Sequence, residues 1–139
     1  MKRHLLIIAY SISLILLIAC CNREQSESTM NLHELDSLSG IYNSPFNKYG
    51  VSYGSVDIKY KSGRTFYFDI KTGHIDGCTG ILNGEFILDS NLVGVYQTRN
   101  GANIRLEFNN HSLKIVEQED CQEHGMRCWF DGEYILNME

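Results

Sequence analysis

VDIKYKSGRTFYFDI, residues 56–70, is the stretch that decides the fold of this 139-residue chain. Apolar and polar side chains alternate on both sides of Gly63, as they do in strands that bury one face only. Ser62-Gly63 is typical of a tight turn, so the stretch predicts an antiparallel hairpin with Phe68 inside and Asp69 outside. The side chains expected to face the core are Val56, Ile58, Tyr60, Phe66, Phe68 and Ile70.

The same alternation continues along the chain, for example through Ile104, Leu106 and Phe108, and turn residues interrupt it at short intervals. Asn83-Gly84 falls inside one apolar run, where it predicts a bulge or a close backbone approach rather than a turn. Eight strands are expected, near residues 40–44, 52–61, 64–72, 78–88, 91–98, 102–109, 112–119 and 127–136.

Eight short antiparallel strands predict an all-β domain, a single small up-and-down barrel, because closure removes exposed sheet edges. Gly40 precedes Tyr42 in the first strand as Gly132 precedes Tyr134 in the last, which suggests that these two strands meet. The alternative is an open two-sheet sandwich. Before the strands, Asn31 and Glu34 have the spacing of a capping box and predict a short N-terminal helix.

The N-terminal segment has the composition of a secretory signal peptide. A basic head is followed by a mostly apolar run over residues 5–19, which is shorter than the roughly 20 residues of a membrane span. Leu17-Ile18-Ala19-Cys20 resembles the signal of bacterial lipoproteins. The resemblance implies cleavage before Cys20, a diacylglycerol on its sulfur and fatty acylation, for example with palmitate, of the new amino group.

The expected organisation is a lipoprotein signal peptide at residues 1–19, a polar tether and short helix at 20–38, and the barrel domain at 39–139. The lipid would hold the protein at the membrane of the cell envelope, in the outer membrane if the cell is Gram-negative. Removing the signal leaves ten basic residues against 17 acidic ones, a formal charge of −7. This charge disfavours nucleic acid and suits a basic envelope or host protein as partner.

Cysteines and a histidine gather at residues 120–128, where five donor side chains fall within nine residues. Two thiolates and an imidazole suit zinc, but the CxxHxxxC spacing is not that of a regular zinc finger. Exported thiols commonly oxidise to disulfides. We therefore expect a disulfide between Cys121 and Cys128, with no metal and no cofactor.

Two further motifs bear on the function of the protein. Gly50 to Gly54 spells G-x-S-x-G, but a nucleophile elbow needs a helix after the serine and here a strand follows, so we expect no enzyme. The loop closed by the expected disulfide would present His124 and Arg127 beside Trp129 as a contact surface. Trp129 could equally pack on the N-terminal helix. The remaining histidines, His33, His74 and His111, are expected in solvent.

The pattern of Gly77-Cys78-Thr79-Gly80, Cys121, His124-Gly125, Cys128 and Phe130-Asp131-Gly132-Glu133-Tyr134 resembles small exported lipoproteins near the lysozyme-inhibitor group. Such relatives often carry another cysteine near position 103, where this chain has Asn103, so Cys78 is left without an obvious partner. The membrane-bound inhibitors of c-type lysozyme are eight-stranded barrels on lipid anchors. Residues 61–64 resemble their inhibitory loop only weakly, so no inhibitory residue is assigned.

These features predict a lipid-anchored, non-enzymatic binding module, with an inhibitor of a basic hydrolase such as lysozyme as its most concrete form. The alternative is a lipocalin-like carrier of a small apolar ligand. The bulky inward positions, such as Phe66, Phe86 and Phe108, argue against a carrier because they should fill a small barrel.

Overall fold

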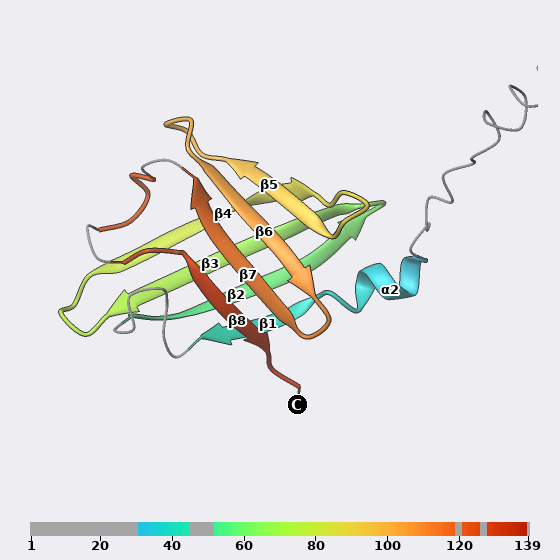
Figure 1. Ribbon diagram of the computed structural model, residues 1–139, viewed down its shortest axis with the longest axis horizontal. Helices are drawn as coiled ribbons and strands as arrows, with labels where there is room; N and C mark the ends of the chain where they lie inside the picture. The colour runs from blue at the N-terminus through green and yellow to red at the C-terminus, as the bar shows by residue number, and fades with distance from the viewer. Residues whose placement is uncertain (1–30, 45–51, 119–120, 126–127, 139) are drawn as a thin grey trace, which may run out of the picture.

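The computed structural model describes residues 31–44, 52–118, 121–125 and 128–138. Over these residues one short helix precedes eight strands (Figure 1). In chain order the elements are α2 (Leu32–Asp36), β1 (Gly40–Ser44), β2 (Ser52–Ser62), β3 (Thr65–His74), β4 (Thr79–Ile87), β5 (Val93–Gln97), β6 (Asn103–Asn109), β7 (Ser112–Gln118) and β8 (Gly132–Leu136).

The hairpin of β2 and β3 has the predicted register. Ile58 lies opposite Phe68 and Val56 opposite Ile70, and all four side chains are buried. Gly63 makes the turn at a φ of 57°, a conformation that glycine adopts without strain. Asp69 lies on the outer face, where it forms an ion pair with Lys71 at 3.1 Å.

All eight strands form one antiparallel sheet in the order β4-β3-β2-β1-β8-β7-β6-β5, a nearly closed barrel. The predicted contact between the first and last strands is confirmed, since Tyr42 lies opposite Leu136 and Asn43 opposite Ile135. The ladder is interrupted between β4 and β5, where Leu88 and Gly94 form an isolated bridge. The structure is therefore the predicted barrel and not the sandwich.

Two glycine–aromatic pairs fill the seam between β4 and β5. A Cβ on Gly84 would lie 2.4 Å from the Tyr96 ring, and one on Gly94 would lie 2.1 Å from the Phe86 ring. Each strand thus contributes one glycine, over which an aromatic side chain of the other strand lies. The prediction of a close approach at Gly84 is confirmed, since β4 runs through this residue without a turn and pairs with β3 on both sides of it.

Aromatic side chains occupy the middle of the barrel. Phe86 stacks on Phe66 and on Phe108, with ring centroids 5.6 Å and 6.0 Å apart, and Phe66 and Phe108 contact each other at 6.3 Å. Tyr96 meets Phe68 edge-on at 5.0 Å. Phe66 and Phe68 are 0% exposed, so the bulky inward residues fill the interior as the sequence predicts.

The helix α2 lies at one end of the barrel and shows the predicted capping box (Figure 1). The Glu34 backbone N–H donates to the Asn31 side chain at 3.0 Å, and the Asn31 N–H donates to the Glu34 carboxylate at 2.9 Å. Leu35 and Leu38 are buried and extend the core at this end.

The two tyrosines that follow Gly40 and Gly132 play equivalent roles. The Tyr42 hydroxyl donates to the Leu38 carbonyl at 2.9 Å, and the Tyr134 hydroxyl donates to the Phe130 carbonyl at 2.8 Å. Both side chains are 0% exposed. Burial raises the pKa of Tyr42 to about 12 and raises the pKa of Tyr134 as well, with Glu117 and Asp131 adding to the rise. The two hydrogen bonds hold the segments that lead into the first and last strands, β1 and β8.

Seven strands match their predicted bounds closely, while the last begins at Gly132 rather than at residue 127. Residues 128–130 retain the alternation of a strand, with Cys128 and Phe130 buried, but they lie outside the β7–β8 ladder, which begins at the pair Ile115–Gly132. The reason is that the segment before β8 contacts the opposite side of the barrel, as described next.

Candidate functional site

The connection between β7 and β8 reaches the start of β4 at the end of the barrel opposite α2 (Figure 1). His124 forms an antiparallel bridge with Gly80, and the Thr72 hydroxyl donates to the Cys128 carbonyl at 3.1 Å. A Cβ on Gly80 would lie 2.8 Å from the His124 Cβ, so glycine permits this approach. The connection therefore lies close against β3 and β4.

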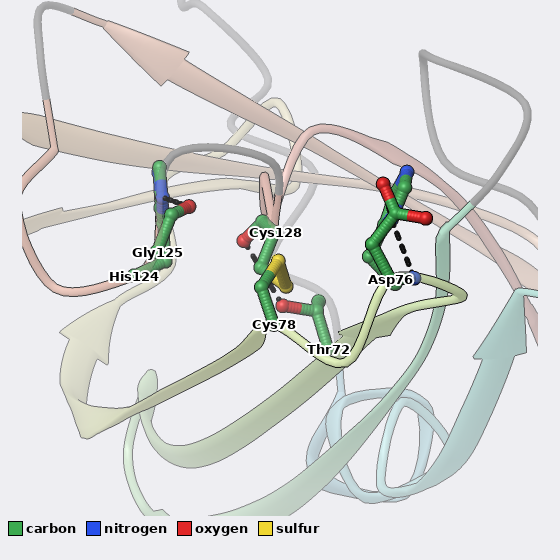
Figure 2. The surroundings of a disulfide bond; sticks show 7 residues. Thr72, Asp76, Cys78, His124, Gly125 and Cys128 are labelled. Carbon is green, nitrogen blue, oxygen red and sulfur yellow. Dashed lines mark hydrogen bonds and ion pairs between the residues drawn. A yellow bond between two sulfur atoms is a disulfide. The ribbon is translucent and has the colours of Figure 1, made fainter.

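A disulfide joins this connection to the residue before β4, and it corrects the predicted pairing. Cys128 is bonded to Cys78, with Cα atoms 6.0 Å apart, and not to Cys121 (Figure 2). The prediction relied on proximity in the sequence, as if residues 121–128 closed a hairpin loop. Because the connection instead reaches β4, Cys128 meets a partner 50 residues away, and Cys121 is outside the disulfide.

Cys121 lies in a cluster with Glu117 and His124. The Sγ atom, a Glu117 carboxylate oxygen and a His124 ring nitrogen all lie within 4.8 Å of one another. Cys121 is 2% exposed, and the side chains of Glu117 and His124 are 2% and 3% exposed. Glu117 follows Leu113 and Ile115 at two-residue spacing in β7, so the strand alternation directs it inward.

Hydrogen bonds orient the imidazole and carboxylate of this cluster. His124 Nδ1 lies 2.8 Å from the Gly125 carbonyl oxygen, and Nε2 lies 2.9 Å from Glu117 Oε2. The backbone N–H groups of Phe130 and Asp131 both donate to Glu117 Oε1. These two donors give the buried Oε1 atom hydrogen-bond partners and hold the carboxylate in place.

The protonation of His124 follows from its neighbours. The Gly125 carbonyl can only accept a hydrogen bond, so Nδ1 carries a hydrogen. A neutral ring would then direct the Nε2 lone pair at a carboxylate oxygen 2.9 Å away. A proton or another cation between Nε2 and Oε2 removes this repulsion.

Cysteine and histidine also invite a comparison with cysteine nucleophiles. In such sites one ring nitrogen faces the thiol as base while the other is held by an orienting group. Here both nitrogens of His124 already face oxygen atoms, those of Gly125 and Glu117. The arrangement suits convergence of three donors on one cation better than proton abstraction from Cys121.

The predicted contact surface is not formed as expected. The His124 side chain is buried rather than projecting, because it packs against β4 and between the rings of Trp129 and Phe130, at 4.9 Å and 5.2 Å. Trp129 is half-buried on this imidazole rather than on α2. Arg127 lies outside the described residues.

His74 is a second correction, since it is 8% exposed and not in solvent. Its Nδ1 accepts the backbone N–H of Asp76 at 3.1 Å, close to the β3–β4 turn. His33 and His111 are exposed as predicted. Sequence reasoning did not select Glu117, although the inward position two residues after Ile115 was a usable signal.

The N-terminal features stay predictions. The signal peptide, Cys20 and the tether lie outside the described residues, as do Gly50 and Val51 of the G-x-S-x-G motif, whereas its Ser52 begins β2. Among the helices that the structure describes, none has the length and apolar character needed to cross a membrane.

Comparison with known proteins adds no assignment. No protein-family model matches the chain, and neither a curated protein nor a solved structure matches it. The function must therefore be argued from the fold and from the cluster at the end of the barrel.

Proposed function

We propose that this chain is a lipid-anchored, non-enzymatic binding module of the bacterial cell envelope. The observation that carries the proposal is the filled interior of the barrel, where the rings of Phe66, Phe86 and Phe108 contact one another. A barrel packed in this way binds partners through its outer face or its ends. The hollow of about 760 Å³ beside the β4–β5 seam opens on the outer face, where Ile87 is 70% exposed.

The filled interior also favours the binding module over the alternative, a lipocalin-like carrier. A lipocalin-like carrier needs an enclosed space for its ligand, as wider or emptier barrels provide. In the part of the chain that the structure describes, the inward positions of the barrel hold buried aromatic and aliphatic side chains. The binding module therefore has the stronger support.

An acidic chain favours a basic partner, for which a hydrolase such as lysozyme is the concrete candidate. The mature formal charge of −7 and the resemblance to the lysozyme-inhibitor group both support this choice. The contacts of His124 support the non-enzymatic part of the proposal, because both of its ring nitrogens face oxygen atoms, those of Gly125 and Glu117.

The anchor is tested by comparing Cys20→Ala with Cys21→Ala in cells fed labelled palmitate. The Cys20 variant should lose the label, because it lacks the sulfur that carries the diacylglycerol. The Cys21 variant should behave as the wild type. Label retained by Cys20→Ala, or lost only from Cys21→Ala, would contradict the anchor.

The partner is tested by titrating lysozyme activity with the chain expressed from Asn22 onward, without signal or lipid, and measuring its affinity at low and high salt. Inhibition and an affinity that falls with salt are expected, because opposite net charges attract more weakly when screened. An acidic protein of similar size serves as the control partner. Absence of binding to lysozyme and to other basic hydrolases at low salt would reject the basic partner.

A further inference from the structure

We propose that Glu117, Cys121 and His124 form a zinc-binding site at the end of the barrel where β4 begins. Three different donor atoms from these residues lie within 4.8 Å of one another, and all three side chains are nearly excluded from solvent. The inference concerns a site separate from any outer-face partner and does not rest on the function proposed above.

The donor set matches zinc chemistry. Thiolate, imidazole and carboxylate are the three side-chain ligands that zinc takes, at about 2.3, 2.0–2.1 and 2.0–2.2 Å. Tetrahedral coordination at these lengths separates neighbouring donors by about 3.4–3.6 Å. Separations within 4.8 Å, with Nε2 and Oε2 at 2.9 Å, need only small side-chain shifts. Calcium and magnesium prefer oxygen donors alone and fit this set less well.

The contacts of His124 orient its ring as in a zinc-bound histidine. The Gly125 carbonyl accepts the Nδ1 hydrogen at 2.8 Å, which is the usual outer contact of a zinc-bound histidine and leaves Nε2 as the ligand atom. That nitrogen points at the Glu117 carboxylate. Zinc would take the place of this hydrogen bond, with Nε2 and a Glu117 carboxylate oxygen both as ligands.

Hydrogen bonds and a disulfide hold the segments that carry the three ligands. Backbone N–H groups of Phe130 and Asp131 hold Glu117, and the Asp131 carboxylate in turn accepts the Glu117 backbone N–H at 3.0 Å. The Cys78–Cys128 disulfide fastens the connection that carries two of the three ligands. Three protein ligands leave the fourth zinc position to water, as in zinc sites that keep one open coordination position.

The test uses the full-length protein in detergent, stripped with a chelator and titrated separately with Zn²⁺ and Co²⁺. One ion should bind per chain, and Co²⁺ should produce the thiolate-to-cobalt charge-transfer absorption together with intense tetrahedral d–d bands. Cys121→Ser, His124→Gln and Glu117→Gln should each weaken zinc binding by at least about tenfold, no less than the loss of an outer contact costs.

Matched controls separate this site from other donors. His111→Gln, Glu123→Gln and Cys21→Ser should keep the wild-type affinity, and circular dichroism checks that every variant is folded. If a cluster variant fails to fold, the cobalt spectrum of the wild type decides the question. Zinc binding that is absent, that lacks the thiolate band, or that depends on a control residue rather than on the cluster would overturn the proposal.

Discussion

Reduction of the Cys78–Cys128 disulfide is expected to lower the free energy of unfolding by about 4 kcal/mol. The bond closes a loop of 50 residues, and the chain-entropy relation for that length gives this value. The pairing predicted from the sequence, between Cys121 and Cys128, would close a much shorter loop worth about 2 kcal/mol. The size of the effect therefore reports which bond is present.

The assay is urea denaturation with and without reductant, applied to the wild type, Cys78→Ala and Cys121→Ala. Cys121→Ala should keep the full difference of about 4 kcal/mol, since its disulfide is intact. Cys78→Ala should lose that difference, because the 50-residue loop cannot form. Peptide mapping of a non-reduced digest identifies the bonded pair directly.

Two results would refute the reasoning. If Cys121→Ala abolished the effect of reductant while Cys78→Ala preserved it, Cys121 would be the true partner of Cys128. If the wild type were equally stable with and without reductant, the bond would not restrain the unfolded chain as argued, whichever cysteines it joined.

Three further predictions follow from the core, the seam and the buried tyrosines. Phe68→Ala should cost about 3–5 kcal/mol in a urea titration, because a side chain 0% exposed leaves a cavity, whereas outward Asp69→Ala should cost less than about 0.5 kcal/mol; equal costs would contradict the register. Gly94→Ala should lower the free energy of unfolding by about 1–3 kcal/mol and lower the melting temperature, since its Cβ would lie 2.1 Å from the Phe86 ring. In the control Gly125→Ala the nearest atom lies at 3.4 Å, so this variant should melt close to the wild type. Equal melting temperatures for the two variants would contradict the close packing at the β4–β5 seam. The raised pKa of Tyr42 means that the stability gained from its neutral hydroxyl is complete below pH 10 and is lost as the pH rises towards 12. In urea titrations repeated at several pH values, Tyr42→Phe should therefore lose less stability at alkaline pH than the wild type. An equal dependence of stability on pH in the two proteins would argue against this effect.

The strands and the helix cap could be predicted because their signals are local. Period-2 alternation at Ile58 and Phe68 assigns each side chain to a face, and Gly63 marks the turn between the strands. The Asn31–Glu34 capping box needs only three-residue spacing. Even the meeting of the first and last strands had a sequence signal, in the glycines that precede Tyr42 and Tyr134.

The candidate site could not be predicted in the same way. Cys121 and His124 were noticed as donors, but Glu117 belongs to a strand and was not connected with them. Whether His124 projects or is buried depends on the connection crossing to β4, which no local pattern encodes. The predicted disulfide was wrong for the same reason. Proximity in the chain does not identify the partner of a cysteine when its segment packs against a distant strand.

The sequence by itself determined an all-β barrel, its eight strands and their inward faces, because hydrophobic alternation and turn residues act over a few positions. Only the tertiary structure decided that the sheet opens between β4 and β5, that Cys128 pairs with Cys78, and that Glu117, Cys121 and His124 converge. These features join segments far apart in the chain. Their contacts depend on how the nearly closed sheet brings these segments together in space, and no single residue determines that arrangement.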